Sequence, residues 1–253
     1  MLMTRVMPCL LLKNGSLVKT VKFKDPGYIG DPINAIRIFN EKEVDELIFL
    51  DISATVEKRQ PPFKVLSEIA SECFMPVTYG GGVRDVETIR QILSLGIEKV
   101  AINSHAVENP DFVRAAAEKF GSSTIVVSMD VRRKMFGKYE VVIHGGRKST
   151  GRDPVEFASA MEKLGAGEIL LTAVDRDGTQ EGYDVELVKS VTSTVGIPVV
   201  ACGGAGKIED FRVAVKEGGA SACAAGSMVV YFGRNRAVLI TFPEREKLEA
   251  ILR

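Results

Sequence analysis

The chain has 253 residues, the size of one large α/β domain, and its 33 basic residues balance its 33 acidic residues. Because the net charge is zero, no overall field attracts nucleic acid or an anionic membrane surface, and an anionic ligand would have to be held by local groups. No apolar run reaches the length of a membrane span, and residues 1–5 lack a secretory signal, so we expect a cytoplasmic protein.

Short β-rich runs alternate along the chain with longer stretches of helical spacing, a pattern typical of parallel strands with crossover helices. The helix expected after the second strand carries an apolar stripe that includes Leu66 and Ile69, and the one after the sixth carries Leu187, Val188 and Val191. The eight predicted strands lie near residues 5–12, 46–52, 76–79, 99–103, 124–130, 168–174, 197–202 and 221–225.

The sequence repeats itself at a constant offset of 122 residues. Glu46-Leu47-Ile48 returns as Glu168-Ile169-Leu170, and Gly81-Gly82 returns as Gly203-Gly204. This predicts two half-barrels, approximately 1–122 and 123–253, fused into a single domain over residues 1–253. We therefore expect a closed (β/α)8 TIM barrel. A doubly wound open sheet is the alternative, but two matching halves of four units close naturally into a ring.

In such a barrel, chemistry belongs at the C-terminal ends of the strands. Two glycine turns follow the third and seventh strands, and their backbone N–H groups could hold phosphate, although glycines also simply make tight turns. Two equivalent turns favour a bisphosphate or another two-ended ligand. The predicted phosphate-binding residues, including the matching ends of the fourth and eighth strands, are Gly81, Gly82, Asn103, Ser104, Gly203, Gly204, Ala225, Gly226 and Ser227.

Acid–base candidates stand at the same ends of the strands: Asp51, Asp130, Asp175 and Asp177. Asp130 ends an apolar strand, where a carboxylate is costly to bury and has no local turn role. Asp175 and Asp177 have an alternative role, because they could cap a turn or pair with Arg176. The sequence predicts neither a metal site nor a cofactor, and the four cysteines are expected to be reduced core residues.

Lys19 lies in the long glycine-containing segment after the first strand. Such a segment could fold over a ligand as a lid, with the lysine meeting the charge of the ligand. A solvated surface loop is the alternative, and the sequence leaves the two open.

Charged residues also mark the opposite ends of the strands. Arg5, Glu46, Lys99 and Glu168 begin the first, second, fourth and sixth strands, so we expect a ring of alternating charge around the lower mouth of the barrel. Such a ring could gate the entry of a small neutral molecule. The alternative is four unrelated side chains that extend from strand ends into solvent.

Over nearly its whole length the sequence resembles the cyclase (synthase) subunit of imidazole glycerol phosphate synthase. The matching stretches are Asp45-Glu46-Leu47, Leu50-Asp51-Ile52, Gly80-Gly81-Gly82, Ala106-Val107-Glu108-Asn109-Pro110, Gly165–Thr172, Asp175-Arg176-Asp177-Gly178-Thr179 and Gly203–Lys207. The resemblance implies a barrel of two half-barrels, a ligand with two phosphates, and ammonia delivered by a glutaminase subunit docked on the N-terminal face.

The resemblance also implies roles for individual residues. It makes the four charged residues an ammonia gate, Lys19 the lid lysine and Asp130 one of two catalytic aspartates. Glu98, next to Lys99, is expected at the interface with the partner. The second aspartate is missing, because Leu11 stands where the family has a Cys-Leu-Asp-Val-Lys-like stretch. Leucine cannot exchange a proton, and loss of one acid or base costs about 10²- to 10⁴-fold in rate.

One branch of the family accommodates this change. Pro8–Lys13, Leu17–Phe23 and Ile38–Leu47 are similar to paralogues found with surface-polysaccharide genes. The resemblance implies that the chain passes ammonia to a sugar amidotransferase that converts an acetamido sugar, a small phosphorylated or nucleotide-linked substrate, into an acetamidino sugar.

Two other functions stay open. The first is the family's own lyase reaction in histidine biosynthesis, with Asp51 or Asp177 covering for position 11. The second is a non-catalytic subunit that only activates the glutaminase.

Overall fold

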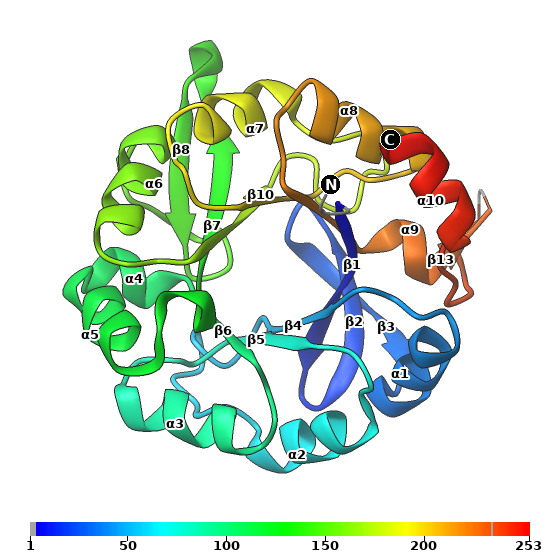
Figure 1. Cartoon of the computed structure of the whole chain (residues 1–253), viewed down its shortest axis with the longest axis horizontal. Helices are drawn as coiled ribbons and strands as arrows, with labels where there is room; N and C mark the ends of the chain where they lie inside the picture. Colours follow the sequence, from blue (N-terminus) through cyan, green and yellow to red (C-terminus); the bar gives the residue numbers. More distant parts are fainter. Residues whose placement is uncertain (1–3, 234) are drawn as a thin grey trace.

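A computed structural model of the chain describes residues 4–233 and 235–253, so residues 1–3 and 234 of the expected domain lie outside the described part. Eight parallel strands form a closed barrel (Figure 1), in which β1 pairs with both β4 and β12 and β10 pairs with β7. The predicted TIM barrel is thus confirmed, and the open sheet is excluded because the pairing of β10 with β7 closes the circuit of eight strands and leaves none of them at an edge. The barrel strands are β1 (Arg5–Lys13), β4 (Leu47–Asp51), β5 (Val77–Gly80), β6 (Lys99–Ile102), β7 (Ile125–Arg133), β10 (Glu168–Ala173), β11 (Val199–Cys202) and β12 (Ala222–Ala225).

Helices surround the barrel and cover its outer face (Figure 1). The predicted stripes are buried: α2 packs Leu66 and Ile69 inward, and α7 packs Leu187, Val188 and Val191. No helix in the described part of the chain is long and apolar enough to cross a membrane. The helices are α1 (Pro32–Glu41), α2 (Phe63–Glu72), α3 (Val86–Ser94), α4 (Ser104–Glu108), α5 (Asp111–Phe120), α6 (Pro154–Lys163), α7 (Val185–Thr192), α8 (Ile208–Lys216), α9 (Ser227–Val230) and α10 (Arg245–Leu252), with 3-10 turns η1 (Ser122–Thr124) and η2 (Met135–Gly137).

Alternation along the strands divides the barrel residues into two sets. One set packs against the helices, and Phe49 and Ile102 belong to it. The other set fills the barrel interior with a separate apolar cluster: Met7, Cys9, Ile48, Ala101, Val126, Leu170, Val200, Cys202, Ala222 and Ala224. The interior is therefore apolar in the middle, with charged residues only toward its two ends.

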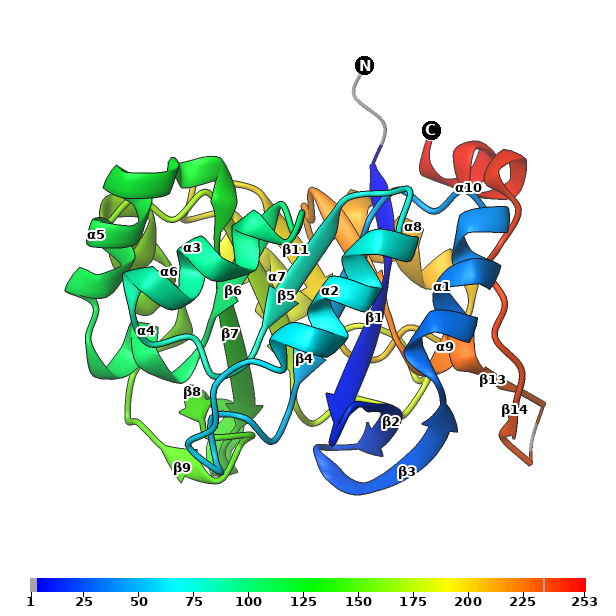
Figure 2. The same ribbon diagram turned by 90° about the horizontal axis from the view of Figure 1, so that it is seen from below.

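The segment after β1 is a β-hairpin rather than a loop. Asn14 and Gly15 have φ of 52° and 78° and turn the chain directly into β2 (Ser16–Val21), which pairs with β1 and with β3 (Lys24–Gly30). An Asn-Gly pair with positive φ at both residues is typical of a two-residue hairpin turn. The hairpin lies at the end of the barrel opposite the N-terminus (Figure 2).

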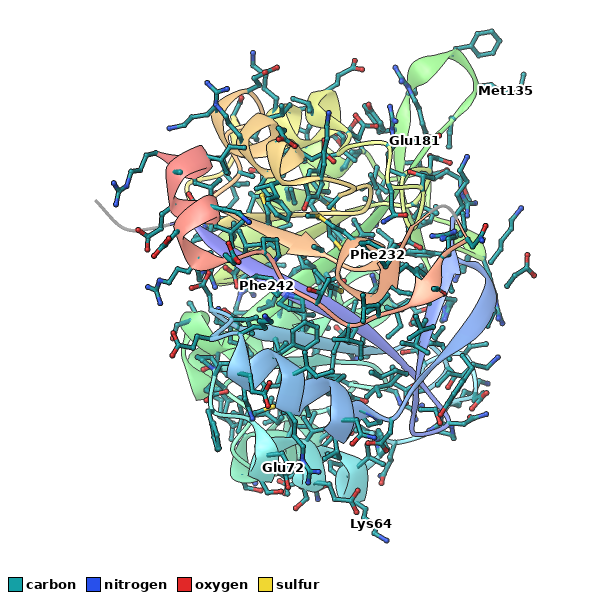
Figure 3. All side chains as sticks on the ribbon, turned by 90° about the vertical axis from the view of Figure 1, so that its right-hand side faces the viewer. Lys64, Glu72, Met135, Glu181, Phe232 and Phe242 are labelled. Atoms are coloured by element: carbon teal, nitrogen blue, oxygen red, sulfur yellow. The ribbon has the colours of Figure 1, made fainter. Side chains whose placement is uncertain are left out.

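A second extension rises from the same end of the barrel. Strand β7 continues past Asp130 to Arg133 and pairs with β8 (Tyr139–Ile143), which in turn pairs with β9 (Lys148–Ser149). We call residues 131–141 the arm. Figure 3 shows Met135 at its projecting tip. A short hairpin, β13 (Tyr231–Phe232) and β14 (Ala237–Val238), follows α9.

Candidate functional site

A cavity of about 430 Å³ opens at the C-terminal ends of the barrel strands. It collects almost every residue that the sequence predicted for this end: Leu11, Lys19, Asp51, Gly81, Gly82, Asn103, Ser104, Asp130, Asp177, Gly203, Gly204, Gly226 and Ser227. Two residues are exceptions: Ala225 is fully buried in the layer between barrel and helices, and Asp175 lies outside the cavity lining, where it accepts a hydrogen bond from the Arg133 backbone N–H. Alternation turns the side chain of Ala225 outward while Ala224 and Gly226 face the cavity, and phosphate binding at position 225 stays a prediction.

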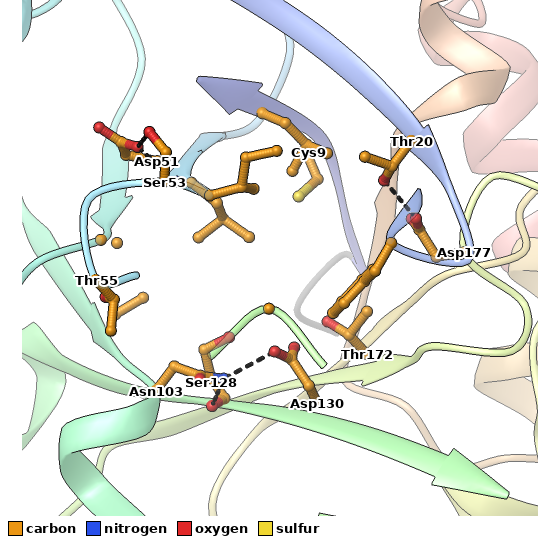
Figure 4. Close-up of a pocket in the computed structure, with 18 of the residues that line it drawn as sticks. Cys9, Thr20, Asp51, Ser53, Thr55, Asn103, Ser128, Asp130, Thr172 and Asp177 are labelled. Carbon is orange, nitrogen blue, oxygen red and sulfur yellow. Dashed lines mark hydrogen bonds between the residues drawn. The ribbon is translucent and has the colours of Figure 1, made fainter. Parts of the chain in front are cut away.

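Asp130 is the best placed carboxylate for proton transfer. The Asn103 amide donates to Asp130 Oδ2 over 3.1 Å and to the Ser128 carbonyl over 2.8 Å (Figure 4). Burial raises the pKa of Asp130 to about 7; the Asn103 hydrogen bond lowers it and the charge of Asp177 raises it further. A group that titrates near neutrality can both accept and return a proton. Asn103 thus orients the carboxylate, a contact that the sequence did not predict.

The raised pKa makes Asp130 a source of pH-dependent stability. Because folding raises this pKa from 3.8 to about 7, the folded state binds the proton more tightly, and the stabilisation present below the lower value is lost as pH rises through the higher one. The free energy of unfolding of the wild type should fall by about 4 kcal/mol between about pH 4 and pH 8 because of this group. We expect this fall to be absent in Asp130→Asn. Urea unfolding of both proteins across this range measures it. If the free energy of unfolding changed with pH equally in the variant and the wild type, the raised pKa of Asp130 would be contradicted.

Lys19 and Thr20 bring the hairpin into the cavity. The Lys19 ammonium donates to the Cys9 carbonyl over 3.2 Å and lies so close to Gly226 that a Cβ there would approach it to 2.0 Å. Thr20 Oγ1 donates to Asp177 Oδ2 over 2.8 Å (Figure 4). Lys19 is therefore buried, and the solvated-loop alternative is wrong; its role as a lid lysine stays a prediction.

Asp51 holds a loop rather than facing the cavity centre. Its Oδ1 accepts hydrogen bonds from the backbone N–H groups of Ser53 and Ala54, each over 2.9 Å, and from the Ser53 hydroxyl over 3.0 Å. Arg59 lies 3.6 Å from the other oxygen. Because these contacts engage both carboxylate oxygens and stabilise the turn after β4, we do not assign Asp51 to proton transfer.

Position 11 gives the cavity an apolar side. Leu11 is only 8% exposed and lines the cavity on β1, four strands around the barrel from Asp130 on β7. The two positions therefore face each other across the barrel. Leu50, Ala101 and Ala224 also line the cavity. Asp130 consequently faces hydrocarbon where a second carboxylate could have stood.

The two glycine turns are required by close packing. A Cβ at Gly81 would lie 2.7 Å from the Asp51 carbonyl, and one at Gly203 would lie 2.7 Å from the Ala173 carbonyl. Their φ values of 131° and 89° also disfavour any other residue. Both turns are thus too tightly packed for a side chain at these positions. Phosphate binding there stays a prediction.

Two cysteines that were expected only in the core also line the cavity. Cys9 points its sulfur into the cavity (Figure 4), and Cys202 lines the same space. Interaction with Cys202 lowers the pKa of Cys9, burial raises it and the charge of Lys19 lowers it. Strand alternation was the signal that could have found Cys9, because it lies two residues before Leu11 and faces the same way.

At the N-terminal face, the four predicted charged residues form one closed set of ion pairs, which we call the ionic ring. Arg5 bonds Glu46 over 2.6 Å and also bonds Glu168, and Lys99 bonds the same two carboxylates over 3.1 and 3.0 Å. Both glutamates are buried. The alternative of four unrelated strand-end charges is wrong. The use of the ring as a gate is a prediction, as is the interface role of Glu98, which is exposed next to Lys99.

A closed (β/α)8 barrel with a carboxylate-bearing cavity at the C-terminal ends of its strands is the architecture of a TIM-barrel enzyme. The histidine biosynthesis protein family matches residues 5–235, and the chain belongs to this family.

Its relatives are named as subunits of one enzyme. The chain is 51% identical over 249 residues to a Pseudomonas aeruginosa protein provisionally named imidazole glycerol phosphate synthase subunit hisF2, covering 98% of this chain and 99% of that protein. It is 51% identical to imidazole glycerol phosphate synthase subunit HisF of Hyphomonas neptunium, covering 92% of each chain. The identity to the subunit HisF of Alkaliphilus metalliredigens is 46%, over 91% of this chain and 92% of that one.

Proposed function

We propose that this chain is the barrel subunit of a glutamine-dependent amidotransferase that passes ammonia to the amidation of a surface-polysaccharide sugar. A glutaminase subunit docks on the N-terminal face, with Glu98 in the interface, and releases ammonia at the ionic ring. The ammonia crosses the barrel interior and leaves through the cavity. A sugar amidotransferase then uses it to convert an acetamido group into an acetamidino group.

One observation carries this proposal: the ionic ring is complete, whereas Leu11 stands opposite Asp130 at the position where the resemblance implies a carboxylate. Entry of ammonia and its final reaction depend on different residues, at opposite ends of the barrel. An apolar interior disfavours the ammonium ion and so favours the neutral, nucleophilic form. The chain retains what transport needs and lacks one of the two carboxylates that the family's own reaction uses.

The experiment combines the purified chain with its glutaminase subunit and the sugar amidotransferase. With glutamine labelled on its amide nitrogen, we expect the label in the acetamidino group and no imidazole glycerol phosphate from the bisphosphate precursor. Asp130→Asn in the same mixture separates a catalytic barrel from a subunit that only activates the glutaminase, because a pure activator would be unaffected by the change. Efficient formation of imidazole glycerol phosphate by the wild-type chain would overturn the proposal.

The second candidate is the synthase reaction of histidine biosynthesis. It is favoured by Asp177, which lines the cavity with Asp130 and is close enough to raise its pKa, so that it is a possible second carboxylate. In that case the two glycine turns hold the two phosphates of the precursor. Growth of a histidine auxotroph that lacks its own cyclase subunit, after introduction of this gene, would favour this function.

A further inference from the structure

The arm presents an unusual pair of apolar side chains to solvent. Met135 is 82% exposed and Phe136 is 96% exposed at its tip. Phe136 also has a φ of 68°, in the left-handed region that a bulky residue rarely adopts and that glycine or asparagine adopts at little cost. The chain therefore keeps a large aromatic ring where neither its own packing nor its backbone favours one.

The base of the arm is braced against the barrel. The Arg133 backbone N–H donates to Asp175 over 2.7 Å, and Tyr139 donates its hydroxyl hydrogen to Asp184 over 2.9 Å. Lys134 pairs with Glu140 over 2.8 Å, and its backbone N–H donates to the Lys138 carbonyl over 2.6 Å. The base of the arm is thus held by the segment after β10, which limits the ordering that binding a partner through the tip would require.

Charge and position indicate what the tip contacts. Between residues 132 and 140 the arm carries four basic residues, Arg132, Arg133, Lys134 and Lys138, against one acidic residue, Glu140. Two of the four are paired, Lys134 with Glu140 and Arg133 with Glu186 over 3.2 Å. The arm extends β7, the strand that places Asp130 in the cavity, and rises from the face opposite the ionic ring. A partner bound here would lie beside the mouth of the cavity.

We propose that the arm docks the ammonia-accepting sugar amidotransferase, by inserting Phe136 and Met135 into an apolar pocket with an acidic rim. This inference rests on the proposed function. Ammonia that leaves the cavity into bulk water is protonated and diluted, so the acceptor enzyme has to cover the mouth closely. An exposed aromatic anchor flanked by basic residues suits such a contact, because aromatic residues dominate the energetics of interfaces and the charges speed association with an acidic partner.

The test measures binding of the purified sugar amidotransferase to the complex of this chain with its glutaminase. Phe136→Gly removes the ring and suits the positive φ, so the variant should fold at least as well as the wild type. We expect affinity for the amidotransferase to fall about 30-fold, with glutamine hydrolysis by the glutaminase unchanged. Phe232→Ser is the matched control, since Phe232 is another exposed aromatic, at 66%, outside the arm. Phe136→Leu should restore part of the affinity, and higher ionic strength should weaken binding by the wild type.

Several outcomes would overturn the arm as a docking site. The first is that the amidotransferase binds Phe136→Gly as tightly as the wild type, and the second is that it binds neither protein. The third is that Phe136→Gly lowers the oligomeric mass of the chain alone, which would place the tip on a second copy of this chain. Failure of the proposed function is distinct from these results, because it appears as absence of label transfer by the wild-type complex, whatever the binding measurements show.

Discussion

Leu11→Asp is expected to raise the rate of imidazole glycerol phosphate formation by about 10²- to 10⁴-fold over the residual rate of the wild-type chain. Position 11 faces Asp130 across the barrel and lines the same cavity, so an aspartate there supplies a second proton-transferring group on the opposite side of a bound substrate. A pair of carboxylates can then act as acid and base in turn. Steady-state turnover of the bisphosphate precursor with ammonium as nitrogen source measures the gain.

Two further variants test whether the increase in turnover depends on the position of the new carboxylate and on Asp130. Leu50→Asp places a carboxylate in the cavity from the neighbouring strand β4, and it should give no comparable increase if position rather than charge matters. Adding Asp130→Asn to Leu11→Asp should remove the gain. The new carboxylate is buried, so Leu11→Asp should also lower the free energy of unfolding by about 1–3 kcal/mol. A correctly folded Leu11→Asp protein with wild-type turnover would show that position 11 does not limit this chemistry.

Arg5→Ala is expected to lower the free energy of unfolding by about 3–5 kcal/mol, because removing one member of a buried ionic network leaves the remaining charge uncompensated. Glu46 and Glu168 are both buried and would then share Lys99 alone. Urea unfolding measures the effect.

The matched control is Arg90→Ala, which breaks an exposed ion pair with Glu87 on α3 and should cost less than about 1 kcal/mol. In the complex with the glutaminase, Arg5→Ala should also reduce the share of ammonia that reaches the acceptor, while glutamine hydrolysis continues. An Arg5→Ala protein as stable as Arg90→Ala would show that the ring contributes no more than a surface pair.

Sequence periodicity was enough to predict the barrel and which candidate residues gather at each of its two faces. The reason is geometric: in a parallel barrel all strand starts meet at one face and all strand ends at the other, so position along a strand fixes the face. Arg5 and Glu168, far apart in the sequence, could be placed together on this basis alone. The ion pairs among the ring residues follow from their alternating sign.

The predictions differed from the structure where the direction of one side chain on a strand, or the conformation of a local turn, decides where a residue lies. Ala225 lies at a strand end as predicted, but its side chain faces outward, because side chains alternate and its neighbours face the cavity. Asp51 lines the cavity, but its carboxylate is held by the turn after β4. The hairpin after β1 was missed although Asn14-Gly15 is a strong turn signal, because the flanking residues are rich in lysine and glycine and do not alternate cleanly. Contacts such as Asn103 with Asp130 depend on side-chain conformation, which periodicity does not encode.

A single strand, β1, runs from the ionic ring at Arg5 to the altered cavity at Leu11, a rise of about 20 Å over six residues. Over that distance the free-energy effects of changes at the two ends should add independently. The residues at one mouth of the barrel could therefore change while the ion pairs at the other stay intact. Such separable ends suit the proposed function, in which the acceptor of the ammonia differs while its point of entry does not.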